Sequence, residues 1–108
     1  MRRSPISRVR CEARARIAKA MAHATRLMLL EALQERERCV SELVELVGSD
    51  QSTVSKHLAI LKSAGLVADR RHGAQSVYRV CCSCLGGFFS CLEAVMQDNL
   101  KAQRAACC

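Results

Sequence analysis

The sequence is short of proline and of aromatic residues. Its 108 residues include one proline, one tyrosine, two phenylalanines and no tryptophan. Alanine, leucine, valine, glutamate and arginine are abundant instead. This composition favours helices over a β-sandwich or a β-barrel.

Long apolar runs are also missing. No stretch approaches the ~20 apolar residues that a membrane span needs. The N-terminal segment starts with charges but has no continuous apolar part, so it does not resemble a secretory signal. We therefore expect a cytoplasmic protein with no membrane partner, in a compartment where thiols stay reduced.

Catalytic constellations are absent from the sequence as well. There is no Ser/His/Asp set, no paired carboxylates and no phosphate-binding loop, and the three histidines are scattered. We therefore expect no enzyme and no required cofactor. The eight cysteines are more typical of metal or redox chemistry than of a disulfide framework in such a compartment.

Basic residues outnumber acidic ones, 17 to 10, which gives a formal net charge of +7. Such an excess suits a polyanionic partner, most commonly nucleic acid, although a basic protein without that partner fits the charge equally well. The length predicts one domain, residues 1–108, with a modest core that dimerisation often completes.

Apolar residues recur at helical spacing in five segments and switch to a strand period in one. The third helix should turn Leu43, Leu46 and Val47 inward, and Gly48 should end it. A hairpin should turn near Gly73. The predicted helices cover about 8–20, 23–36, 40–47, 51–64 and 82–104, and the hairpin covers about 66–80.

Two short helices joined by a glycine-containing turn are typical of a helix-turn-helix, here at about 40–65. A hairpin that follows directly, the wing at about 66–80, makes the unit a winged helix. The fold class is therefore mainly α with a small β-hairpin, in the order α-α-α-α-β-β-α. The second helix of the unit has a polar outer face, which is typical of a DNA-reading helix but also of any amphipathic surface helix. The predicted DNA contacts are Gln51, Ser52, Thr53, Ser55, Lys56 and His57 on this helix and Arg71 in the wing, with Arg70 and His72 beside it.

The stretches AMAHATRLMLLEAL and CVSELVELVGSDQSTVSKHLAILKSAGLVADRRHGAQSVYRV resemble the ArsR/SmtB family of metal- and metalloid-responsive repressors. The resemblance covers about residues 17–80. It implies a symmetric homodimer that is built from the first and last helices and binds double-stranded operator DNA. It also implies that an inducer weakens the affinity for this DNA. His23 and Ala24 depart from the family, which often has aspartate and usually proline there.

The family's usual inducer sites are depleted in this sequence. Residues 81–108 contain no histidine for the zinc site of the last helix. Only Cys39 remains of the thiol pattern before the helix-turn-helix, and its first interpretation is a small core residue. The second helix lacks the cysteine that the family's persulfide sensors use.

The sequence offers Cys81, Cys82 and Cys84 instead, directly after the wing. Thiolates select soft ions, and arsenite or antimonite favours three of them. We therefore predict release by As(III) or Sb(III) bound to these three cysteines, against the alternative that they are small apolar packing residues. Accessory candidates are Cys91, Cys39, Cys107 and Cys108, with Cys11 as a further possible ligand.

Three other interpretations stay open. The first is a thiol-redox or persulfide-responsive repressor of the same fold, and the second is a sensor of soft divalent ions such as Cd, Pb or Zn. The third is a thiol-rich metal-buffering protein, which would bind no operator.

Overall fold

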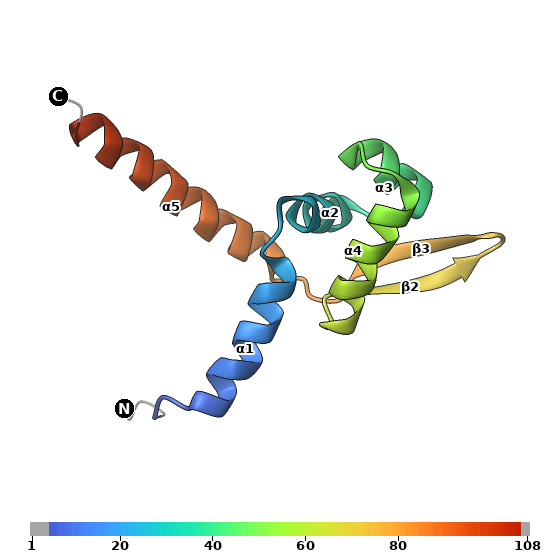
Figure 1. Cartoon of the computed structure of the whole chain (residues 1–108), viewed down its shortest axis with the longest axis horizontal. Coiled ribbons are helices and arrows are strands. Elements are labelled where there is room, and N and C mark those ends of the chain that lie inside the picture. The colour runs from blue at the N-terminus through green and yellow to red at the C-terminus, as the bar shows by residue number, and fades with distance from the viewer. Residues whose placement is uncertain (1–4, 107–108) are drawn as a thin grey trace.

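The computed structural model describes residues 5–106, and the predicted candidates Cys107 and Cys108 lie outside them. The five helices and the hairpin follow the predicted order, and a short additional strand extends the hairpin to a three-stranded antiparallel sheet (Figure 1). The predicted mainly α winged fold is confirmed. The elements are α1 (Arg8–Met21), α2 (Ala24–Glu35), β1 (Arg38–Cys39), α3 (Val40–Val47), α4 (Gln51–Ser63), β2 (Val67–His72), β3 (Gln75–Val80) and α5 (Leu85–Ala106).

Helices α1 and α2 are each capped at the N-terminus by the side chain of the preceding residue. The Ser7 hydroxyl accepts a hydrogen bond from the Arg10 backbone N–H at 3.3 Å. At α2 the acceptor is Nδ1 of His23, 3.1 Å from the Thr25 backbone N–H. An imidazole therefore satisfies one of the free N–H groups at this helix end, at the position where the family often has aspartate.

The helix-turn-helix is set by its turn residues. Gly48 ends α3 with φ +72°, in the left-handed region that glycine enters without a steric cost. Two residues later the Asp50 carboxylate caps α4 by accepting from the Thr53 backbone N–H at 2.8 Å. The core beneath contains Leu29, Leu30 and Leu33 of α2, Leu43 of α3, and Val54, Leu58 and Leu61 of α4.

The sheet has the strand order β1-β3-β2. Strands β2 and β3 form the predicted hairpin, which we call the wing, and Gly73 at its turn has φ +66°. The sequence did not predict β1, which pairs Arg38 with Tyr78 and Cys39 with Val77. This short strand ties the segment before α3 to the wing.

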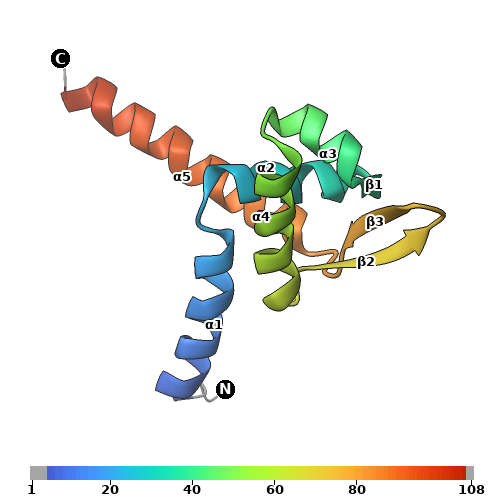
Figure 2. The ribbon, with the colours of Figure 1, turned by 45° about the vertical axis from the view of Figure 1, so that its right-hand side comes forward.

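Helix α5 begins at Leu85, later than the predicted start at Cys82, and Leu85 is its one buried residue among those described. Helices α1 and α5 extend away from the body in different directions (Figures 1 and 2). The apolar residues of α5 are therefore left on the surface of the chain, with Phe88 40%, Leu92 36%, Val95 56%, Met96 55% and Leu100 48% exposed.

The prediction that Leu46 lies in the core is wrong. Leu46 is 50% exposed, while Leu43 on the same helix is fully buried. It borders a shallow groove between α2 and α3 together with Met28 and Val47. A helix of eight residues has room for one inward stripe, and that stripe is centred on Leu43.

Candidate functional site

The outer face of the N-terminal part of α4, residues 51–57, is polar because the one apolar residue there, Val54, points inward. Val54, Leu58 and Leu61 are fully buried, whereas Ser55 and Lys56 are exposed. The other exposed residues at the start of this helix are Gln51 and Ser52. Four of the predicted DNA-contact residues thus face away from the core.

The cap of α4 uses part of this face. The Ser52 hydroxyl donates to Oδ1 of Asp50 at 3.1 Å, and the Thr53 backbone N–H donates to the same oxygen. Hydrogen bonds from the Thr53 backbone, the Thr53 side chain and Ser52 lower the pKa of Asp50, in that order of size. Ser52 and Thr53 therefore hold the first turn of α4, and the Ser52 hydroxyl oxygen can still accept a hydrogen bond.

A polar groove of about 380 Å³ lies between α3, the start of α4 and the wing. It brings together three predicted residues, Gln51 and Ser55 from α4 and Arg71 from the wing. The sequence did not single out its other polar members, which are Ser41, Gln75, Ser76 and Tyr78. A groove lined by hydroxyl, amide and guanidinium groups suits a phosphate backbone.

The phenol of Tyr78 lines this groove. Burial of the phenol is the main reason that its pKa is raised, and the negative charge of Asp69 adds to the effect. The neighbouring Arg70 is committed elsewhere, because it forms an ion pair with Glu37 at 2.7 Å. Of Arg70 and Arg71, it is Arg71 that lines the groove.

His57 is turned toward α2. Its Nδ1 accepts a hydrogen bond from Nε of Arg26 at 3.1 Å, and its ring centroid lies 4.4 Å from that of His23. Burial lowers the pKa of His57, and the charges of His23 and Arg26 lower it further. These contacts anchor α4 on α2, whereas a direct DNA contact by His57 stays a prediction.

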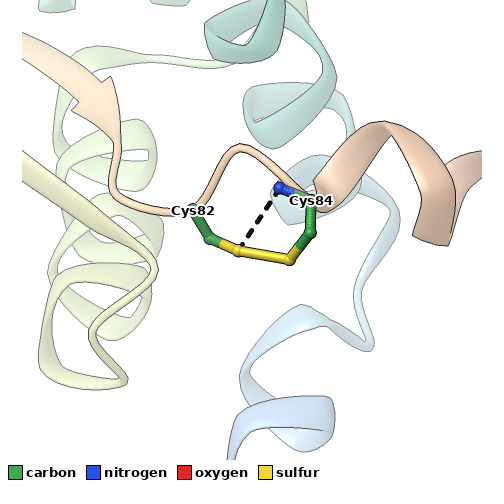
Figure 3. The surroundings of a disulfide bond; sticks show 2 residues. All are labelled: Cys82 and Cys84. Atoms are coloured by element: carbon green, nitrogen blue, oxygen red, sulfur yellow. Dashed lines mark hydrogen bonds between the residues drawn. A yellow bond between two sulfur atoms is a disulfide. The ribbon is translucent and has the colours of Figure 1, made fainter.

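The three predicted ion ligands follow the wing, but the structure does not assemble them as an ion site. Cys82 and Cys84 are joined by a disulfide (Figure 3), and Cys81 is a free, exposed thiol. The Cys84 backbone N–H also donates to Sγ of Cys82 at 3.4 Å. Within residues 5–106, no group of three or more His, Cys, Asp or Glu side chains is placed to hold a metal ion.

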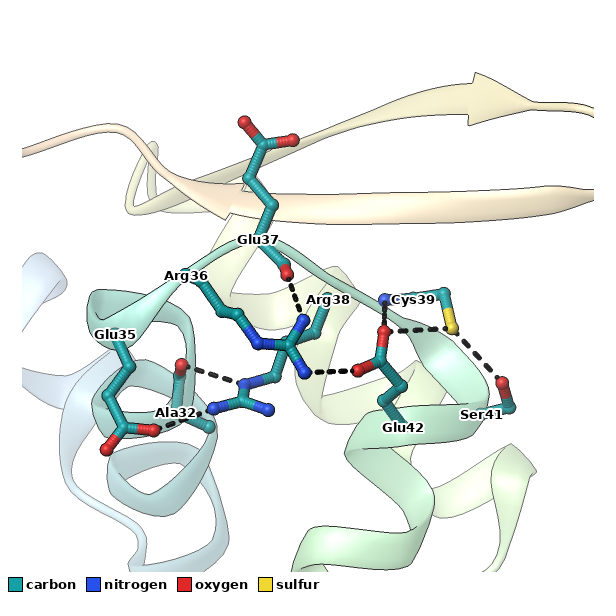
Figure 4. Close-up of polar contacts among 8 residues, drawn as sticks. All are labelled: Ala32, Glu35, Arg36, Glu37, Arg38, Cys39, Ser41 and Glu42. Atoms are coloured by element: carbon teal, nitrogen blue, oxygen red, sulfur yellow. Dashed lines mark hydrogen bonds and ion pairs between the residues drawn. The ribbon is translucent and has the colours of Figure 1, made fainter.

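Cys39 belongs to a polar network and not to the core that was its first interpretation. Its Sγ lies 3.1 Å from the Ser41 hydroxyl and 3.4 Å from Oε1 of Glu42, which also accepts from the Cys39 backbone N–H (Figure 4). Arg36 donates to the other oxygen of Glu42 at 2.7 Å. The Arg36 hydrogen bond, followed by those from Cys39, lowers the pKa of Glu42 to about 2.

The remaining candidate thiols in the described part of the chain belong to the two helices that extend from the body (Figure 1). Cys91 lies on α5 and Cys11 on α1, and both are exposed. No described helix is long and apolar enough to cross a membrane.

Helices α3 and α4 together with the wing define a winged helix-turn-helix, a class of DNA-binding fold. Residues 23–69 match the family described as "Bacterial regulatory protein, arsR family". A homodimeric winged helix-turn-helix domain of Mb0332 from Mycobacterium bovis, solved by NMR, is similar with a TM-score of 0.75 and 30% identity, over 93% of this chain and 95% of that one. The chain therefore belongs to the arsR family of bacterial regulatory proteins.

Two curated relatives come from Mycobacterium tuberculosis. The transcriptional regulator Rv0324 is 35% identical over 80% of this chain, and the transcriptional repressor SmtB is 38% identical over 71% of it. The matches span 38% of Rv0324 and 57% of SmtB, so the chain covers about half the length of these relatives. The family and the fold are those of DNA-binding transcriptional regulators.

Proposed function

We propose that the protein is a homodimeric transcriptional repressor that binds double-stranded operator DNA and is released by a thiophilic metalloid ion, As(III) or Sb(III). The observation that carries the DNA-binding part is the polar groove between α4 and the wing. It places Gln51, Ser55 and Arg71 on one surface of a chain with a formal net charge of +7. Direct contacts to base edges from α4 and phosphate contacts from the wing are the two parts of such recognition.

The apolar face of α5 supports the homodimer. A 22-residue helix with one buried residue leaves more apolar surface exposed than a monomer usually carries. Val9 and Ile17 of α1 add to it, 75% and 42% exposed. The similar Mb0332 domain is a homodimer. A second copy that packs its own α1 and α5 here would present two copies of α4 to a symmetric operator.

The position of Cys81 supports a sensor role for the segment after the wing. Its backbone N–H donates to the Leu66 carbonyl at 2.9 Å, and the Leu66 N–H donates to the Leu61 carbonyl at the end of α4 at 3.0 Å. Leu66 therefore links the segment to α4, the proposed recognition helix. Thiolates of Cys81, Cys82 and Cys84, once all three are reduced, would supply the soft ligands that such an ion prefers. Binding that favours the form unable to read the operator would weaken DNA affinity by the typical ~1–3 kcal/mol of coupling.

The DNA-binding part is tested by selecting an operator from random duplexes and measuring its affinity at fixed salt. Ser55→Ala and Arg71→Ala should each weaken binding by about tenfold, roughly 1.4 kcal/mol, with the dimer still folded. Ser63→Ala is the matched control, because this exposed serine lies at the other end of α4 and does not line the groove. Unchanged affinity in both groove variants would refute the assignment of the groove.

The sensing part is tested by titrating arsenite and antimonite into the operator complex of the reduced protein. The triple variant Cys81→Ser, Cys82→Ser, Cys84→Ser should stay bound to DNA, whereas the matched control Cys91→Ser should still be released. If the triple variant were released at the same concentration as the unaltered protein, the three cysteines would not be the site. A panel with Cd, Pb and Zn ions distinguishes a sensor of soft divalent ions.

A second candidate, a thiol-redox-responsive repressor, is favoured by the disulfide between Cys82 and Cys84. In that case oxidation alone would release the operator, without any ion. Thiol counting after treatment with peroxide or polysulfide, set beside the operator affinity, separates this function from ion sensing.

A further inference from the structure

The disulfide uses two of the three sulfurs that the proposed function assigns to the ion. A thiolate binds a soft ion, whereas a sulfur already bonded to another sulfur carries no such charge. The bond between Cys82 and Cys84 leaves Cys81 as the one free thiol of the segment. Disulfide formation and three-thiolate ion binding therefore exclude each other.

The segment is held at both of its ends. At one end, the Cys81 backbone N–H is bound to Leu66 at the base of the wing. At the other end, the Cys84 carbonyl accepts from the Gly87 N–H at 3.1 Å, and Leu85 is buried in the core. The disulfide lies between these two anchors, with 5.5 Å between the Cα atoms of Cys82 and Cys84.

The DNA-reading face is assembled while the disulfide is present. The polar groove contains Ser55 and Arg71, and none of its lining residues lies in the Cys81–Cys84 segment. The disulfide lies where β3 leads into α5 (Figures 1 and 3), whereas the groove is lined in the wing by Arg71, Ala74, Gln75, Ser76 and Tyr78. The oxidised segment is therefore compatible with the arrangement that we propose binds DNA.

We propose that the Cys82–Cys84 pair is a redox gate on the ion sensor, an inference that rests on the proposed function. The dithiol form binds the ion and responds to it. The disulfide form stays bound to the operator and no longer responds to the ion, so oxidation makes the repressor insensitive to its inducer. This differs from a redox-responsive repressor, in which oxidation itself would release DNA.

Thiol–disulfide exchange with a low-molecular-weight disulfide accounts for the step. The thiolate of one cysteine attacks a sulfur of the small disulfide, forms a mixed disulfide and expels one small thiolate. The second cysteine then attacks the protein sulfur of the mixed disulfide and expels the other. In total, two protein thiols are oxidised to one disulfide, one small disulfide is reduced to two thiols, and the two protons pass to the leaving thiolates.

The test uses the full chain as a dimer with Cys11, Cys39, Cys91, Cys107 and Cys108 replaced by serine, so that three thiols remain. One sample is reduced with a phosphine that is removed before titration. The other is oxidised with glutathione disulfide, and its mass should show the loss of two hydrogen atoms. Operator affinity is measured by fluorescence anisotropy in both samples, before and during an arsenite titration.

We expect equal operator affinity in the two samples without arsenite, release of the reduced sample by arsenite, and loss of that release in the oxidised sample. Renewed reduction should restore the response. If both samples are released alike, the gate is wrong and the proposed sensor stands. If oxidation alone releases DNA, the gate is wrong and the protein is a redox-responsive repressor.

A different result would refute the proposed sensor itself. If the reduced sample binds the operator but ignores arsenite, the sensor assignment fails, and the gate fails with it. The variant Cys81→Ser is the matched control, because it keeps the oxidisable pair but lacks the third sulfur. It should form the disulfide to the same extent and should respond to arsenite less than the three-thiol protein does.

Discussion

The hydrogen bond from Arg26 to His57 should stabilise the recognition helix measurably. Nε of Arg26 lies 3.1 Å from Nδ1 of His57, and Nη1 of Arg26 donates to the Ala20 carbonyl at 3.0 Å. A third bond, to the Lys19 carbonyl at 3.4 Å, is exposed. One arginine thus joins the end of α1, the start of α2 and the middle of α4.

The expected loss of unfolding free energy follows from these contacts. A net contribution of about 1 kcal/mol for each of the two short hydrogen bonds, and little for the exposed one, gives a loss of about 2 kcal/mol for Arg26→Ala. His57→Ala should cost about 1 kcal/mol or more, because the ring contact with His23 is also lost. The coupling between the two substitutions in a double-mutant cycle should be about 1 kcal/mol, which is the shared bond.

Urea unfolding at one fixed protein concentration measures these free energies, because assembly makes stability depend on concentration. Arg16→Ala, at an exposed arginine of α1, is the control and should change stability by no more than about 0.5 kcal/mol. Additive effects of Arg26→Ala and His57→Ala would refute the reasoning, since the bond would then carry no free energy.

The same bond predicts a pH dependence. His57 accepts at Nδ1, so it must be neutral, and its pKa in the folded chain lies below the ordinary value of 6.5, chiefly because of burial. The unfolded chain therefore binds more protons between the folded pKa and 6.5, so stability rises with pH across this window. The contribution is complete above pH 6.5 and is lost as the pH falls through the folded pKa. The coupling should shrink over the same range, and a coupling independent of pH would contradict the assigned acceptor.

Three further predictions concern other parts of the fold. Gly87→Ala should stabilise α5 by about 0.5–1 kcal/mol in thermal unfolding, because alanine favours the helix and its Cβ meets no other atom. Gly86→Ala should stabilise α5 by less, because its Cβ would lie 2.6 Å from the side-chain amide nitrogen of Gln34, which would have to move. NMR titration of Glu42 should give a midpoint near pH 2, and Arg36→Ala should raise it, whereas an unchanged midpoint would show that the ion pair is absent in solution. Val95→Glu should convert a dimer into a monomer in sedimentation experiments without unfolding the core, and a persistent dimer would place the interface elsewhere.

The order of the helices and of the hairpin could be predicted from the sequence because it depends on residues that are close together in the chain. The period of the apolar residues, Gly48 in the left-handed region and the Asp50 cap fix α3 and α4 almost to the residue. The two-residue strand β1 could not be found, because Arg38 and Cys39 become a strand only by pairing with distant β3. Pairing of this kind leaves no periodic trace in so short a segment.

The candidate site was predicted less completely, for reasons of the same kind. Exposure of Ser55 and Lys56 follows from helical spacing, but the orientation of His57 depends on Arg26, which lies 31 residues earlier in the sequence. The groove residues of α3 and the wing come together only through β1 and the hairpin register. Cys82 and Cys84 were expected as free thiols on the argument of compartment, and their spacing in sequence did not show that they could pair.

The single buried residue of α5 has a consequence for how the regulator responds to its own abundance. Most of the stability of a helix in a protein comes from the packing of its apolar face, so the order of α5 depends on whatever covers that face. If a second copy supplies that cover, folding of α5 and assembly become one equilibrium whose position depends on concentration. Amide hydrogen exchange in α5 should then slow as the protein is concentrated, while exchange in α2 and α4 stays nearly constant. The population able to span a symmetric operator would rise with the square of chain concentration when the chain is dilute, which gives a steeper threshold for repression than a pre-formed dimer would.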